Sequence, residues 1–551
     1  MAAKKITVMG GVVAVLLLGA VGAWYGVTGT IVKHTERFLT NLASKQVEGT
    51  ASYRVTYDRI TRTTFPTIGA RLVNPTYTFE AAGDDNEKLP PVKFSVKLDG
   101  VADTITDYLG NAYRFTSSGA STITIEVGEE KIVATSAPKT WTAAIKAKDR
   151  KAFQVWNTLD FNDAQQVQVA LKGLAQASFD SGAMRYTDAS GATLLSSDKA
   201  AISFTNRSAD AGIDFDLALE FKAMEAGEAY IQTVERLMAS ISPAMPIKLS
   251  DMPFSIARAG KQDMDIALSV NLPQGFSANA AGAGNIDVKK FALKNNYYAF
   301  SAPTQLALSD AGGQRDVKVK LDWTLDVSPT GAAEGQRLLD MAAAFAPPPS
   351  AEAPYDMEAL KQKVTAALPT VSTLGPINLV IDLDAVAPKP AGVDATQGNA
   401  AGRDSVTLRQ FRFGHKRWAL EARGESLNDE KAGATINMTL ICKQCDTLTG
   451  DVFATAQGAQ EAANLTAPDR PQWQLTPALL AQLNSTLAEI GTKDASGDVT
   501  FTFSTPTPGD VAVNGQSMAQ VVPKLMAVFA AAQPVPEAVP EVAPAPKLKE
   551  N

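Results

Sequence analysis

The chain has 551 residues, which is enough for two or three domains with a core each. Hydrophobic residues make up 45% of it and charged residues 20%, a balance that is typical of globular proteins and excludes wholesale disorder. With 51 Lys and Arg against 58 Asp and Glu, the net charge is -7, which repels phosphate backbones, so we expect no nucleic-acid partner.

Cysteine and histidine are scarce, with two residues of each in the whole chain. Zinc, copper and haem sites use several thiolate or imidazole ligands at once, so the sequence predicts no metal and no other cofactor. Few side chains remain that can act as a general base near neutral pH. We therefore expect a protein that is not an enzyme.

The N-terminus has the pattern of a membrane anchor. Residues 1–5 form a short basic cytoplasmic start, and the segment 6–28 carries no charge and is mostly apolar. About 20 apolar residues in a helix cross the hydrocarbon core of a bilayer. Lysines stay on the cytoplasmic side and aromatic residues suit the membrane interface. The predicted membrane-interface residues are Lys4, Lys5, Trp24 and Tyr25.

This anchor predicts a single-pass protein of the bacterial inner membrane, with its bulk in the periplasm. A cleaved signal peptide is the alternative, because small residues at 21–23 offer a cleavage point. The apolar stretch is longer than the core of a usual signal peptide, and the bulky Trp24 follows at once, which favours the anchor. Under both interpretations the rest of the chain is exported.

Alternation of apolar and polar residues with a period of two dominates the chain after the anchor. The longest example runs from Val317 to Val327, and the segment 213–221 separates Ile, Phe and Leu from Asp and Glu in the same way. This pattern is typical of antiparallel sheets with one dry face and one wet face. Further alternating segments are 92–98, 123–127, 264–270, 436–440 and 499–503.

Three amphipathic helices are predicted to cover parts of this sheet. Thr476 and Pro477 have the pattern of an N-cap and a first helical turn, and Gly491 is placed to end that helix. The other two helices are predicted over 231–238 and 521–529. These helices are few, so much of the apolar side of the strands is left for something else to cover.

Three consecutive prolines, 347–349, indicate a linker between two β-rich regions. The predicted fold is mainly β with some α: a transmembrane helix, then an extended, curved antiparallel β-sheet with a few covering amphipathic helices. A tail rich in Pro, Ala and Glu cannot bury enough surface to fold and is predicted to be disordered. The predicted parts after the anchor are a periplasmic β-rich domain over 29–345, a Pro-rich linker and helix over 346–375, a second β-rich region with C-terminal helices over 376–530, and the tail over 531–551.

Cys442 and Cys445 form the sharpest short motif in the chain. A thioredoxin-like site needs such a pair to open a helix after a strand, where the helix dipole lowers the thiol pKa. Here the pair follows the predicted strand 436–441, and the next residues are polar and strand-like, which indicates a hairpin turn. We therefore expect a local disulfide of an oxidising compartment, with a redox pair as the alternative and zinc as the weakest one.

A basic and aromatic turn is predicted around His415, between two strands. A surface turn accounts for this histidine better than a role as catalytic base does. Arg412, Lys416 and Arg417 are the candidates for contact with an anionic headgroup. The sequence holds no nucleophile elbow, phosphate-binding loop or dinucleotide fingerprint.

The region that follows the anchor resembles a known family. It combines the small and aromatic residues 22–26 that close the anchor, a short helix over 31–42, a strand over 53–57 and a bend at Phe65-Pro66, and 511–515 adds a similar feature near the end. In these features the chain is similar to the YdgA-like family of bacterial inner-membrane proteins. That family distantly resembles the AsmA-type proteins, which implies an anchored, curved β-sheet associated with phospholipid traffic and envelope upkeep. It has no agreed activity, so the resemblance implies no functional residue.

We therefore expect a non-catalytic periplasmic protein whose apolar sheet face binds lipid acyl chains in envelope maintenance. The expected partners are the lipid bilayer, a lipid ligand and another envelope protein. One alternative is an interaction scaffold that docks an envelope protein and uses the Pro-rich tail as a tether. The other is a hydrolase that acts on glycans through a pair of carboxylates.

Overall fold

The chain is mainly β: of the residues that the computed structural model describes, 60% lie in strands and 22% in helices. Of the predicted anchor 6–28, only residues 27 and 28 are among the described residues, and they lie in a helical stretch over 27–33. Among the described helices, none has the length and apolar character that crossing a bilayer requires. The described residues are 27–33, 35–36, 46–47, 51–81, 91–128, 130–157, 169, 172–208, 212–241, 252, 255, 258–272, 283–311, 314–334, 337–338, 375–388, 404–429, 433–466, 475–507 and 509–532.

Two compact units make up the chain. Unit 1 comprises Met1–Leu338 and Val386–Ala400, and unit 2 comprises Leu339–Ala385 and Ala401–Asn551. Almost all of the predicted linker 346–375 lies outside the described residues, and so does the predicted tail beyond Ala532.

Unit 1 consists of antiparallel strands with helices between some of them. Its helices include α2 (Arg150–Asn157) and α4 (Glu228–Ile241), and the second of these matches the helix predicted over 231–238. Its strands are β1 (Gln46–Val47), β2 (Ala51–Thr56), β3 (Arg59–Arg62), β4 (Gly69–Val73), β5 (Thr76–Ala81), β6 (Val92–Asp107), β7 (Ala112–Val127), β8 (Glu130–Ser136), β9 (Lys139–Ala147), β10 (Leu174–Asp180), β11 (Met184–Thr187), β12 (Thr193–Ser197), β13 (Lys199–Asn206), β14 (Ile213–Ala226), β15 (Gln262–Leu272), β16 (Gly284–Lys294), β17 (Tyr298–Ser301), β18 (Thr304–Ala311) and β19 (Gln314–Val327).

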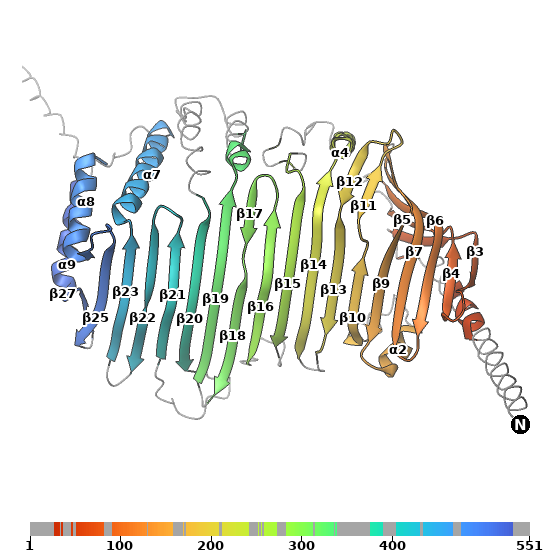
Figure 1. Cartoon of the computed structure of the whole chain (residues 1–551), viewed down its shortest axis with the longest axis horizontal. Coiled ribbons are helices and arrows are strands. Elements are labelled where there is room, and N and C mark those ends of the chain that lie inside the picture. The colour runs from red at the N-terminus through yellow and green to blue at the C-terminus, as the bar shows by residue number, and fades with distance from the viewer. Residues whose placement is uncertain are drawn as a thin grey trace, which may run out of the picture. The chain divides into compact units, whose positions relative to one another are not determined.

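These strands form an antiparallel meander that grows in chain order, as Figure 1 shows from β6 to β19. β6 pairs with β7 along its whole length, β7 with β8 and β9, and β9 with β10. The sheet continues through β13, β14, β15 and β16 to β17 and β18, which both pair with β19. Short connections between neighbouring strands make this order the natural one for alternating segments.

A line of irregular residues crosses this sheet from β6 to β13, and we call it the crease. It consists of Gly100 and Gly119 inside β6 and β7, and of Pro138, Gly182 and Asp198, each of which separates two short strands. Gly100 and Gly119 are cross-strand partners, and a Cβ on either would lie within 2.3 Å of a backbone oxygen of the neighbouring strand. Gly119 also has a φ of +144°, which favours glycine. The two strands therefore approach closely only because neither residue has a side chain.

Unit 2 combines an antiparallel sheet with three helices. β21, β22, β23 and β25 pair in this order, β25 also pairs with β24 and β26, and β26 pairs with β27. The elements are β20 (Ile377–Pro388, of which 377–385 belong to this unit), β21 (Asp404–Gly414), β22 (Ala419–Asp429), β23 (Gly433–Lys443), α7 (Cys445–Thr466), α8 (Pro477–Ile490), β24 (Thr492–Lys493), β25 (Val499–Thr507), β26 (Asp510–Val513), β27 (Gln516–Ser517) and α9 (Met518–Ala532).

The predicted capping residues of α8 are confirmed. The Thr476 hydroxyl accepts a hydrogen bond from the backbone N–H of Leu479, and Pro477 begins the helix. Gly491 ends it, although its φ of -91° does not require glycine. A Cβ at this position would lie 2.3 Å from a methyl carbon of Val499, so glycine is needed for close packing of the helix end on β25.

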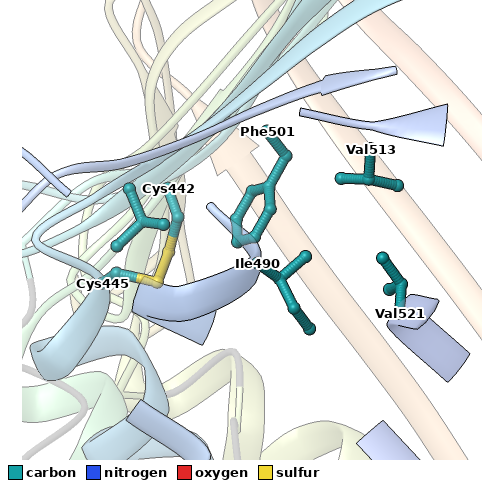
Figure 2. Close-up of a cluster of buried hydrophobic side chains, with 7 residues drawn as sticks. Cys442, Cys445, Ile490, Phe501, Val513 and Val521 are labelled. Atoms are coloured by element: carbon teal, nitrogen blue, oxygen red, sulfur yellow. A yellow bond between two sulfur atoms is a disulfide. The ribbon is translucent and has the colours of Figure 1, made fainter. Parts of the chain in front are cut away.

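The core of unit 2 lies where the three helices meet the sheet. Figure 2 shows Phe501 of β25 and Val513 of β26 packed against Ile490 of α8 and Val521 of α9, with the Cys442–Cys445 disulfide beside them. Each of these side chains is less than a tenth exposed. The helices predicted from the sequence to cover the sheet therefore do so in this unit.

Candidate functional site

The central strand of unit 1, β14, separates its side chains by chemistry. Leu217, Leu219 and Phe221 project to one side, and Asp216 and Glu220 alternate with them on the other. In an antiparallel sheet, directly opposite residues on paired strands project to the same face. The register of the neighbouring strands therefore shows how far each face extends.

The apolar side of β14 continues across the whole meander. The row through Leu219 reads Phe179, Ile202, Leu219, Ile266 and Phe291, from β10 to β16. The row through Phe215 continues toward β19 as Val270, Ile286, Leu306 and Val319. On the N-terminal side, the row from β5 to β8 reads Phe79, Phe94, Ile125 and Ile132. We call the surface formed by these rows the apolar face of unit 1.

The apolar face is open over much of its area. Phe79 and Phe94 are 42% and 39% exposed, and Trp323 and Leu325 of β19 are 37% and 36% exposed. Every side chain of β14 from Ile213 to Glu225 is half-buried rather than enclosed. Side chains of this size in a core are usually almost completely buried, so this contiguous apolar surface is a candidate binding surface.

The described helices of unit 1 lie at the ends of strands. Phe153 of α2 is only 2% exposed and packs on Tyr113 of β7, with ring centroids 5.0 Å apart. Burial there raises the pKa of Tyr113 to about 12. α4 contacts β8 and β12 (Figure 1). These two helices cover the ends of the sheet and leave the apolar side chains between them half-exposed.

The opposite face of unit 1 is charged, and we call it the polar face. Lys199 of β13 binds Glu220 of β14 at 2.6 Å, and Arg207 binds both Asp214 and Asp216. The hydrogen bond from Arg207, followed by one from Ser269, lowers the pKa of Asp216 to about 2. Such exposed cross-strand ion pairs suit a surface that faces water. The two faces of one sheet therefore differ in chemistry.

The predicted hydrolase would need a carboxyl group that stays protonated near neutral pH, as a general acid does. The pKa of Asp216 is shifted in the opposite direction. A small open depression on the polar face contains Lys146, Gln176, Ser178 and Ser203 but no carboxylate. Within the described ranges, no group of three or more His, Cys, Asp or Glu side chains can hold a metal ion.

Cys442 and Cys445 are joined by a disulfide, with their Cα atoms 5.0 Å apart. The prediction of a hairpin turn around them is wrong. Cys442 is the second-last residue of β23, and Cys445 is the first residue of α7. The polar residues after Cys445 form a helix because Leu448 packs on the core of unit 2. Both cysteines are 3% exposed, so the pair has the strand-to-helix position of a redox site without the access that thiol exchange needs.

The basic turn around His415 joins β21 to β22. Arg412 binds Glu421 and Arg417 binds Asp451, each at 3.1 Å, so carboxylates already pair two of the three predicted headgroup contacts. Lys416 is exposed. The predicted surface position of His415 is wrong, because its ring is only 4% exposed and packs on Trp418, and this burial lowers its pKa.

The predicted membrane-interface residues Lys4, Lys5, Trp24 and Tyr25 lie outside the described residues. Sequence reasoning missed Lys139 and Tyr186, which the register places on the apolar face of unit 1. Lys139 stands at the start of a strand with weak alternation, 139–147, so its face could not be assigned without the pairing partners. The alternation along this strand places Lys139 on the same face as Trp141, Ala143 and Ile145, and this pattern could have identified it.

Comparison with family models, with curated proteins and with solved structures finds no match for this chain.

Proposed function

We propose that unit 1 binds the acyl chains of lipids on its apolar face, as a non-catalytic protein of the bacterial envelope. The observation that carries this proposal is the series of apolar side chains that the register places on one face from β5 to β19, with large residues more than a third exposed. Transfer of each acyl methylene from water to such a surface contributes about 0.8 kcal/mol. Many methylenes laid along the sheet add up to a useful affinity.

The location proposed for this function is the periplasmic side of the inner membrane, with residues 6–28 as the anchor. The disulfide between Cys442 and Cys445 supports an exported location, because such bonds persist in oxidising compartments. The resemblance to the YdgA-like family agrees with the same compartment and stays a prediction from the sequence.

The test measures lipid that stays with the full chain after purification from membranes in mild detergent, by solvent extraction and mass spectrometry. We expect the Leu219→Asp variant to retain about tenfold less lipid than the native chain, because a carboxylate on the apolar face has no partner there. The matched control is Ala218→Asp, which places the same charge on the polar face one residue earlier in β14. It should retain lipid normally.

Circular dichroism and urea unfolding establish that both variants are folded. A native chain without lipid, or equal loss of lipid in both variants, contradicts the proposal. Recovery of one protein in constant ratio to the chain, in place of lipid, supports the interaction scaffold instead.

A further inference from the structure

At the crease, the apolar face contains a row of residues that is not apolar. Gly100 of β6 pairs with Gly119 of β7, and Gly119 pairs with Lys139 of β9. Two successive strands therefore expose bare backbone beside the lysine. A side chain on either glycine would collide with the backbone of the neighbouring strand, so no larger residue fits at these two positions.

Lys139 has no acidic neighbour on the rows around it. One flanking row reads Leu98, Ser121 and Ser136, and the other reads Ala102, Ser117 and Trp141. The ammonium lies 5.4 Å from the centre of the Tyr186 ring, and no described carboxylate is within ion-pair distance of it. Burial lowers the pKa of Lys139. By contrast, the described lysines Lys199, Lys222 and Lys290 on the polar face are ion-paired.

Hydroxyl groups lie on both rows that flank this lysine, on the same face of the sheet. The hydroxyls of Ser121 and Ser136 lie 2.8 Å apart, and that of Ser121 lies 3.3 Å from the phenol oxygen of Tyr186. Ser117, two residues from Gly119 on the same face, is 1% exposed, and its buried hydroxyl has no hydrogen-bond partner. A buried polar atom without a partner is uncommon in proteins. Beside the crease, a lysine that is ion-paired to no described carboxylate thus lies near hydroxyl groups inside an apolar surface.

We infer that Lys139, with Tyr186 and Ser121 beside it, binds the anionic group of an amphiphile whose acyl chain lies on the apolar face. The inference rests on the proposed function and adds the chemical class of the ligand: an acyl chain that ends in a phosphate or a carboxylate. Lysine ammonium groups bind such oxyanions as point charges, and the bond is stronger where water is partly excluded. Gly100 and Gly119, on the same row as Lys139, have no side chain that could pair with the ammonium or cover it.

The test uses the full chain and three fluorescent lipids that differ in their headgroup: a phosphatidylglycerol, a fatty acid and a diacylglycerol. We expect the phosphate and the carboxylate lipid, or one of these two, to bind about tenfold more tightly than the neutral diacylglycerol. The Lys139→Met variant keeps the apolar stem and should lose this preference while it still binds diacylglycerol. Lys139→Arg should retain the preference.

The matched control is Lys146→Met, which removes an exposed lysine from the polar face of the same strand and should leave the preference unchanged. A pH series adds a second readout: the preference should fall on raising the pH earlier than an ordinary lysine would allow, and Lys139→Arg should remove this dependence. Equal binding of all three lipids, or an unchanged preference in Lys139→Met, overturns the headgroup site and leaves the proposed function intact. Failure of every lipid to bind overturns both.

Discussion

The two units of the chain use the same strand pattern with opposite outcomes. In unit 2, Phe501 of β25 lies under α8 and α9 and is 8% exposed, whereas Phe94 of β6 in unit 1 is 39% exposed. A gradient exists even inside unit 2, because Phe413 of β21, farther along the same face, is 38% exposed. An apolar strand face is therefore core or surface according to whether a helix packs on it.

The first way to test this difference is to remove one aromatic ring from each unit. We expect Phe501→Ala to lower the free energy of unfolding of unit 2 by about 3–5 kcal/mol, because it leaves a cavity between sheet and helices. Phe94→Ala removes the same ring from a half-open surface and should cost unit 1 about 1 kcal/mol. Urea unfolding of both variants measures this, and equal losses would mean that the face of unit 1 is covered.

A second test loosens the helix cover of unit 2 without touching the sheet face. The Asn514 amide donates hydrogen bonds to the carbonyls of Ile490 and Thr500, and its oxygen accepts one from the Thr502 N–H. Asn514→Ala loses these bonds and strains a φ of 47°, so we expect a loss of about 2–3 kcal/mol in urea unfolding. Asn514→Gly relieves the backbone and should recover part of this loss. Wild-type stability in the alanine variant would refute the role of Asn514.

The disulfide provides a smaller effect that is confined to the covered unit. Replacement of Cys442 and Cys445 together by alanine opens a four-residue loop, and chain entropy predicts a loss of about 2 kcal/mol in unit 2. Reductant should act on the native chain only slowly, because both sulfurs are buried under the helices. Rapid reduction of the folded protein, measured by thiol labelling, would instead support the redox alternative.

The smallest effect concerns the polar face of unit 1 in acid. The pKa of Asp216 is lowered from 3.8 to about 2 in the folded chain, so its stabilising contribution is complete above about pH 5 and is lost as the pH falls through 2. The pair is exposed, and the gain is therefore below about 1 kcal/mol. Urea unfolding at several pH values should show a shallower acid dependence for Asp216→Asn. Arg207→Gln should give the same change. An acid dependence equal to that of the wild type in both variants would show that this ion pair does not stabilise the fold.

Much of the fold could be predicted from local patterns. The alternating segments at 92–98, 213–221 and 317–327 are strands, and Thr476 and Gly491 delimit a helix, because side-chain period and capping chemistry act over a few residues. The error at Cys445 shows the limit of local patterns. The polar stretch after it forms a helix that packs on residues far away in the chain.

The sequence by itself determined which side chains of each strand are apolar, since that depends only on alternation along the backbone. Tertiary structure alone decided which of these surfaces became core, because α8 and α9 must pack on β25 to bury it. It also decided that Lys139, Tyr186 and Ser121 share one face, because β7 pairs with β9 and β8 pairs with β11, which are not consecutive in the chain. Pairing between distant strands has no local signature, and for that reason the headgroup site emerged only from the folded sheet.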